Sequence, residues 1–148
     1  MLKHRLLAEW AADCAERVLP LFAREHLDDD RPSRAIEATR AWARGEIRVG
    51  AARDAALAAH AAARETSDPA RAAARAAGQA ASTPHMADHS LGAMMYAVKA
   101  VRLASDASDS QPAAQREYEW QLQHLPTQVR DLVLSALEEG SVLGRWRP

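Results

Sequence analysis

The sequence lacks the features that mark secreted, disulfide-rich or membrane-spanning proteins. Its 148 residues include a single cysteine, Cys14, which rules out an internal disulfide and is typical of a reducing compartment. It contains no run of about 18 apolar residues, so we expect no membrane-spanning helix. Glu9 and Asp13 interrupt the apolar stretch near the N-terminus, so we expect no signal peptide and a cytoplasmic location.

A charge excess of one sign is also missing, because 19 Lys and Arg residues balance 20 Asp and Glu residues. This balance supplies no overall field that would attract nucleic acid or an anionic membrane, and we expect neither as a partner. The sequence has no G-x-S-x-G, P-loop, G-x-G-x-x-G, C-x-x-C or H-E-x-x-H motif, and no E-x-x-H spacing that would support a di-iron bundle. We therefore predict no catalytic residue and no cofactor, which favours a protein that is not an enzyme.

The sequence does contain helical periodicity. Apolar residues recur at spacings of three and four, and no alternating run rich in Val, Ile and Thr is present. This pattern predicts an all-α fold, a single-domain bundle of about six to seven helices over residues 1–140. We expect residues 141–148 to form a flexible C-terminal tail.

Glycine and proline divide the first part of the chain into helices. In the first predicted helix, Trp10, Cys14 and Val18 share one apolar stripe, and Pro20 is expected to kink the helix or end its regular part. The acidic run at residues 28–30 precedes a second helix, where carboxylates suit the positive end of the helix dipole. That second helix is expected to stop at Gly45.

Alanine dominates the middle of the chain, with 17 alanines among the 31 residues from 51 to 81. Alanine favours helix strongly, and its small side chain lets neighbouring backbones approach closely. Asp68 is a candidate N-cap and Pro69 a candidate first helical residue, so together they predict two helices here. Two further helices are predicted after the next segment, over residues 112–124 and 126–140.

The segment HMADHSLGAMMYAVKAV, residues 85–101, has two histidines four positions apart at the head of an apolar run. Its period predicts a central helix near residues 85–104. At 100° per residue, one face of this helix carries five polar or small positions, with apolar groups covering most of the remainder. These five positions are His85, His89, Gly92, Tyr96 and Lys99.

Three hypotheses fit the histidine pair. Both rings can be buried and hydrogen-bonded structural groups, or they can belong to a binding surface. They can also serve metal binding or catalysis, with His60 as a further candidate ligand, because histidines at i and i+4 can share one metal ion. Asp88 is a poor orienting partner for either ring, because adjacent helical residues point about 100° apart. The candidate binding residues are therefore His60, His85, Asp88, His89 and Tyr96, and whether a metal binds stays open.

Three stretches together resemble a known family: RLLAEWAADCAERVLPLF, AIEATRAWARGEIRVGAARDAALAAHAAARE and HMADHSLGAMMYAVKAV. They are similar to the predicted immunity proteins of the five-like group in bacterial polymorphic toxin systems, which are all-helical cytoplasmic domains of about this length. The resemblance covers most of residues 5–137 and includes Trp10, the W-x-x-G-E at residues 42–46, and the histidine pair followed by Tyr96. It implies a bacterial protein that binds and neutralises a cognate protein toxin without turnover.

Two other functions remain as alternatives. One is a small helical enzyme or a ligand- or metal-binding protein that uses a cleft lined by His85, His89 and Tyr96, which predicts a substantial pocket at those residues. The other is an interaction scaffold that forms a homodimer through its alanine-rich helices. An immunity protein is instead expected to present an exposed, charged binding face.

Overall fold

The computed structural model describes residues 1–139, and these form seven α-helices and no strand. The all-α prediction and the predicted number of helices are therefore confirmed. The predicted tail at residues 141–148 lies outside the described residues. The helices are α1 Leu2–Ala23, α2 Arg31–Ala43, α3 Val49–Arg64, α4 Ala70–Ser82, α5 His89–Ala104, α6 Ser110–Gln123 and α7 Thr127–Glu139.

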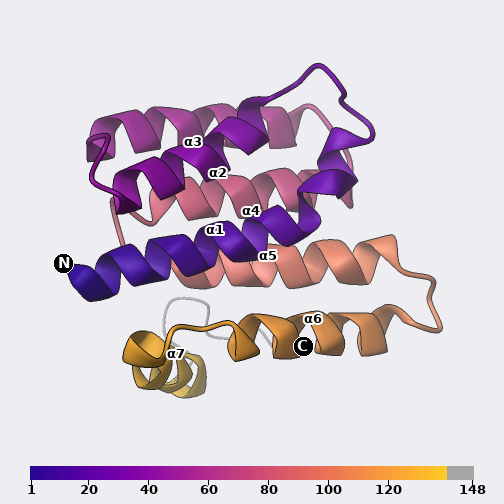
Figure 1. Cartoon of the computed structure of the whole chain (residues 1–148). Helices are drawn as coiled ribbons and strands as arrows, with labels where there is room; N and C mark the ends of the chain where they lie inside the picture. Colours follow the sequence, from indigo (N-terminus) through magenta and orange to yellow (C-terminus); the bar gives the residue numbers. More distant parts are fainter. Residues whose placement is uncertain (140–148) are drawn as a thin grey trace.

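The helices form two layers. Helices α3, α4, α5 and α6 lie side by side in chain order, each against the next, while α1 and α2 pack together over α4. Helix α1 also contacts α5 and α7, and α2 also contacts α3. Figure 1 shows α1 to α6 running roughly along one direction, whereas α7 is seen nearly end-on. The side of α3, α4 and α5 that faces away from α1 and α2 is called the outer face below.

Helix α4 lies in the middle of the bundle, because it contacts α1, α2, α3 and α5. Only four of its residues escape burial, and they recur at spacings of three and four, so they form one stripe on the outer face. The residues of this stripe are Arg71, Arg75, Gln79 and Ser82. The alanine content that favoured helix in the sequence therefore serves to bring four neighbouring helices close to one axis.

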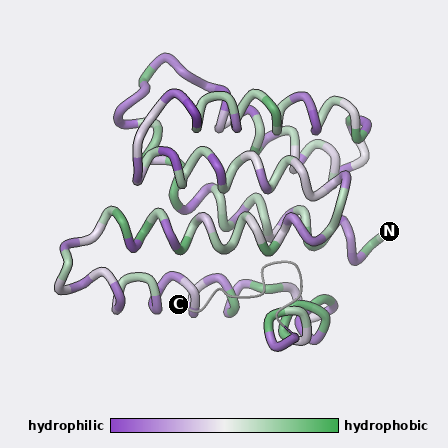
Figure 2. Tube along the Cα trace, turned by 180° about the vertical axis from the view of Figure 1, so that it is seen from behind, coloured by the Kyte–Doolittle hydropathy of each residue, from purple (hydrophilic) through white to green (hydrophobic). Residues whose placement is uncertain are grey.

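The predicted apolar stripe of α1 is buried in the core, with Trp10 and Cys14 fully buried and Val18 nearly so. The indole N–H of Trp10 donates to the backbone carbonyl of Gln121 at 2.8 Å, which anchors α6 to α1. Hydrophilic and hydrophobic segments alternate along each helix in Figure 2, as expected for helices with one buried side. The core therefore follows the period that the sequence shows.

Two predicted boundaries differ from the structure. Of the two outcomes predicted for Pro20, an end of the helix is wrong, because α1 continues to Ala23, whereas a kink stays a prediction. Proline has no backbone N–H, so one carbonyl in the preceding turn of α1 has no hydrogen-bond donor from the helix. Pro20 is exposed, so this carbonyl is near solvent and can bind water. The second difference is the start of α5 at His89, because residues 83–88 form turns after α4 in which the amides of His85 and Met86 both donate to the carbonyl of Ser82. The central helix therefore begins four residues later than predicted.

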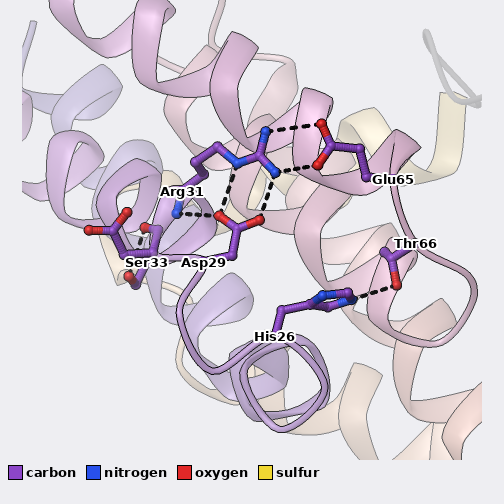
Figure 3. A network of polar contacts seen from close by, with 7 residues as sticks. His26, Asp29, Arg31, Ser33, Glu65 and Thr66 are labelled. Atoms are coloured by element: carbon purple, nitrogen blue, oxygen red, sulfur yellow. Dashed lines mark hydrogen bonds and ion pairs between the residues drawn. The ribbon is translucent and has the colours of Figure 1, made fainter.

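Polar contacts join the loop between α1 and α2 to the end of α3, as Figure 3 shows. The guanidinium of Arg31 lies 2.7 Å from Asp29 and 2.6 Å from Glu65, and a ring nitrogen of His26 lies 2.8 Å from the hydroxyl of Thr66. The acidic run at residues 28–30 therefore has a structural role at the entry to α2. No helix within residues 1–139 is both long and apolar enough to cross a membrane.

We predict that Cys14 in the folded protein reacts with a thiol reagent such as Ellman's reagent far more slowly than a free thiol. Burial, together with the nearby charge of Asp13, raises its pKa well above the ordinary value, and the ring of surrounding helices blocks access. Reaction should become fast in denaturant. Fast stoichiometric labelling of the folded protein at neutral pH would show that α1 is not packed as described.

Candidate functional site

The predicted site residues occupy three elements. His60 lies on α3, His89 is the first residue of α5, and both are half-buried. Tyr96 follows on α5 and is half-buried, with the ammonium of Lys99 6.0 Å from its ring centre. His85 and Asp88 are exposed and belong to the turns before α5. The prediction that His85 and His89 share one helical face is therefore wrong, because the first of them precedes the helix.

Helix α4 brings His60 and His89 together on the outer face. The Nη1 atom of Arg75 lies 2.9 Å from Nδ1 of His60, and Oε1 of Gln79 lies 2.7 Å from Nδ1 of His89. The two histidines come from the two helices that flank α4, so each is held by one residue of the α4 stripe. We call these four residues, His60, Arg75, Gln79 and His89, the histidine cluster.

Two glycines make room for the histidine cluster. A Cβ atom added to Gly78 on α4 would lie 2.5 Å from Cε1 of His60, and one added to Gly92 on α5 would lie 2.4 Å from Oε1 of Gln79. Both distances are shorter than any normal contact, so the imidazole and the amide occupy the space of the missing side chains. The glycines are therefore required by close approach of side chains between helices rather than by a turn.

The hydrogen bonds set the protonation of the two rings. Arginine can only donate, so Nδ1 of His60 accepts from Arg75, and the neutral ring carries its proton on Nε2. The amide oxygen of Gln79 can only accept, so Nδ1 of His89 is the donor in that pair. Neither Nε2 atom has a hydrogen-bond partner within residues 1–139.

Burial, and after it the charges of Arg75, Arg64 and His89, together lower the pKa of His60 to about 4. Burial also lowers the pKa of His89, as does the charge of His85, while Asp88 opposes the change. Both imidazoles of the cluster are therefore neutral at pH 7. The electrostatic field around His60 is positive, since every charged group that shifts its pKa is a cation.

Two cavities among the described residues 1–139 are not lined by the residues of the predicted cleft. A cavity of about 80 Å³ between α1, α5 and α7 is lined by Asp88 among apolar residues such as Leu7 and Val133. An open hollow of about 420 Å³ follows α1 beside Pro20 and Leu27. Neither is lined by His85, His89 or Tyr96. Within residues 1–139 no group of three His, Cys, Asp or Glu side chains could hold a metal ion.

Sequence reasoning did not select Arg75 or Gln79, although a signal for them exists. Polar residues at Arg71, Arg75 and Gln79, each four apart in an otherwise alanine-rich helix, indicate a single exposed stripe. What could not be read from this pattern is the pairing with His60 and His89, since the register between three helices decides it.

Trp120 on α6 lies partly at the surface of the molecule. It is half-buried, and the guanidinium carbon of Arg17 lies 4.0 Å from its ring centre. The ring of His124 stacks on the indole with centroids 3.8 Å apart. Trp10 and Trp42, in contrast, are buried. A half-buried aromatic group on α6 therefore contributes to the surface of the molecule.

The described residues form an all-helical bundle, and comparison with known families gives a more specific class. Residues 1–128 match the family described as Imm-5 like putative immunity protein. The chain belongs to this family, as the resemblance of its three characteristic stretches implied. Comparisons with curated proteins and with solved structures gave no match.

We predict that Gly78→Ala lowers the free energy of unfolding by up to about 1 kcal/mol, because loss of the His60 hydrogen bond, which costs about 1–2 kcal/mol when the added methyl displaces the ring, outweighs the helix propensity gained. Gly50→Ala is the matched control, since nothing lies within 4 Å of its added Cβ. That control should raise stability by up to about 1 kcal/mol, the helix propensity difference between the residues. Urea unfolding followed by circular dichroism measures both, and equal stabilisation by the two changes would contradict the described packing.

The lowered pKa of His60 predicts a loss of stability in mild acid. The unfolded chain takes up a proton on this residue near pH 6.5, whereas the folded protein does so only near pH 4, so protonation favours unfolding between these values. We expect about 2 kcal/mol less stability at pH 4.5 than at pH 7, with partial exposure of the ring taken into account. Urea unfolding at the two pH values tests this.

His60→Gln is the control for the acid effect, because it keeps a polar side chain and removes the titrating ring. The variant should lose much of the pH dependence above pH 4.5. The carboxylates of Asp29, Glu46 and Glu65 have lowered pKa values, so their contribution is lost at lower pH. An unchanged pH dependence in His60→Gln would show that the imidazole is not held neutral as described.

Proposed function

We propose that this chain is an immunity protein that binds a cognate protein toxin of the same bacterial system and neutralises it by occupying part of its surface. The observation that carries the proposal is the match of residues 1–128 to the Imm-5 like putative immunity protein family. Neutralisation of this kind needs tight association and no chemistry in the immunity protein. It is consistent with a sequence that lacks the common catalytic motifs.

We propose the outer face of α3, α4 and α5 as the contact surface. It carries His60, His89 and Tyr96, three of the binding residues that the sequence suggested, and His85 and Asp88 border it in the turns before α5. Two properties support this choice. Its polar groups are held in fixed positions by the histidine cluster, and a pre-formed surface loses less conformational freedom on binding than a mobile one. It also holds an exposed arginine stripe, and arginine, tyrosine and histidine offer both charge and ring surface to a partner.

We propose that electrostatic attraction guides the toxin to this face. Arg64 and Arg75 lie near His60, and no acidic side chain takes part in the histidine cluster itself. A toxin with an acidic patch would be attracted to this region and oriented by it, which speeds association. Arg40 on the other layer differs from Arg75, because the carboxylates of Glu9, Asp13 and Glu16 on α1 surround it.

The test is co-expression with the toxin encoded next to this gene. We expect growth in the presence of the toxin to be restored by the chain, and the two proteins to co-purify as a defined complex. Absence of a toxin gene from the locus, or toxicity that is unchanged by the chain together with no measurable complex, would contradict the proposal.

Variants distinguish the proposed face from the rest of the surface. His89→Ala and Tyr96→Ala should each weaken toxin binding by about tenfold or more, as expected for residues near the centre of an interface. Arg34→Ala on α2 is the control, since its exposed ion pair with Asp30 lies on the other layer. Equal affinities for all three variants would place the contact surface elsewhere on the bundle.

A further inference from the structure

Three arginines are half-buried within residues 1–139, and they differ in what they hold. Arg31 contacts the carboxylates of Asp29 and Glu65, at 2.7 and 2.6 Å. Arg40 contacts three carboxylates of α1, at 2.8 to 3.0 Å. Arg75 contacts the neutral ring of His60 instead, and no carboxylate lies within ion-pair distance of it in the described part of the chain.

A half-buried cation without a counter-charge is unfavourable, because the protein removes part of its hydration and returns only one neutral hydrogen bond. The surroundings of Arg75 add to this cost. His60 is close to Arg64 as well as to Arg75, and both arginines contribute positive charge. Asp88 is an exposed acidic side chain in this region, and its charge raises the pKa of His89 rather than that of His60. The site therefore has positive potential that nothing within residues 1–139 neutralises.

The donors at this site suit an oxyanion. A guanidinium has five N–H donors, and one nitrogen of Arg75 is occupied by His60. Because Nδ1 of His60 accepts that bond, His60 holds the guanidinium in position, whereas the Nε2–H of its ring points away from Arg75 and lies beside Gly78 of α4. The remaining N–H donors of the guanidinium are coplanar and carry positive charge, so they match the two oxygens of a carboxylate. The positive charge of the guanidinium disfavours a metal cation at this site.

We propose that Arg75 and His60 form a receptor site for a carboxylate, and that the acidic side chain of the bound toxin supplies it. This inference rests on the proposed function for the identity of the partner, whereas the site itself follows from the unpaired arginine. The bound carboxylate provides Arg75 with the counter-charge that Arg31 and Arg40 find within the chain. Gly78 contributes by leaving the space in which the His60 ring lies beside Arg75.

The first experiment uses acetate as the probe and needs no toxin. The imidazole Hε1 signal of His60 is followed by NMR during titration with sodium acetate at pH 7 and constant ionic strength, with sodium chloride as the reference salt. We expect a saturable shift with a dissociation constant of about 10–100 mM, which is reasonable for a small ion. Bound acetate should also raise the pH at which His60 titrates, because it offsets the charge of Arg75.

Arg75→Gln should abolish the saturable shift, and Arg53→Gln should retain it. Both variants remove one positive charge, but Arg53 is exposed on α3 and takes no part in the histidine cluster. Circular dichroism and the dispersion of the NMR spectrum show that each variant is folded. A linear, unsaturated response of the wild-type protein, or the same response in Arg75→Gln, would overturn the inference.

The second experiment measures toxin affinity. Arg75→Gln should weaken binding at least tenfold, Arg34→Gln on the other layer less than threefold, and acetate at saturating concentration should compete with the toxin. If the wild-type protein binds no toxin, the proposed function fails before any variant is compared. If the wild-type protein and the Arg75→Gln variant bind the toxin equally tightly, the proposed function stands and the inference about Arg75 is wrong. Inorganic phosphate that saturates the site without weakening toxin binding would show that a free anion, rather than the toxin, is the ligand.

Discussion

The close packing of α4 is the constraint on which the remainder of the structure depends. This helix contacts four others, and its buried positions are all alanine or glycine, so there is little side-chain volume to separate the backbones. Any larger group near its axis must either point to the outer face or lie over a glycine. Both solutions occur, because Arg75 and Gln79 point outward while His60 lies over Gly78. The polar surface of the molecule is thus a consequence of how its core is packed.

The same constraint explains why the histidine cluster is rigid. His60 and His89 belong to different helices, yet each is hydrogen-bonded to α4. Gly78 leaves space for the ring of His60, and Gly92 leaves space for the amide of Gln79. Burial in this arrangement keeps both rings neutral at pH 7, so Nδ1 of His60 can accept a hydrogen bond from Arg75. Packing therefore determines protonation, and protonation allows the hydrogen bond that holds Arg75.

The surface of the bundle has two regions that differ in local charge. Three carboxylates of α1 surround Arg40, so the charge excess around this arginine is negative. On the outer face the arginines near His60 lack carboxylate partners within the described residues, so the excess there is positive. Overall charge balance in the sequence therefore conceals two local fields of opposite sign. The proposed function and the proposed carboxylate site both draw on the positive one.

The sequence alone determined the all-α fold, the apolar stripe of α1 with buried Trp10 and Cys14, and most helix ends, since these follow from local periodicity and from residues such as Gly45 that adopt a positive φ. It also suggested His60 and His89 as binding residues. It misplaced the start of α5, because the chain turns after Pro84 before the helix begins, and this took His85 out of the helix. Only the tertiary structure decided that Arg75 and Gln79 hold the two histidines, because that pairing depends on the relative register of three helices, and no periodicity within one helix specifies it.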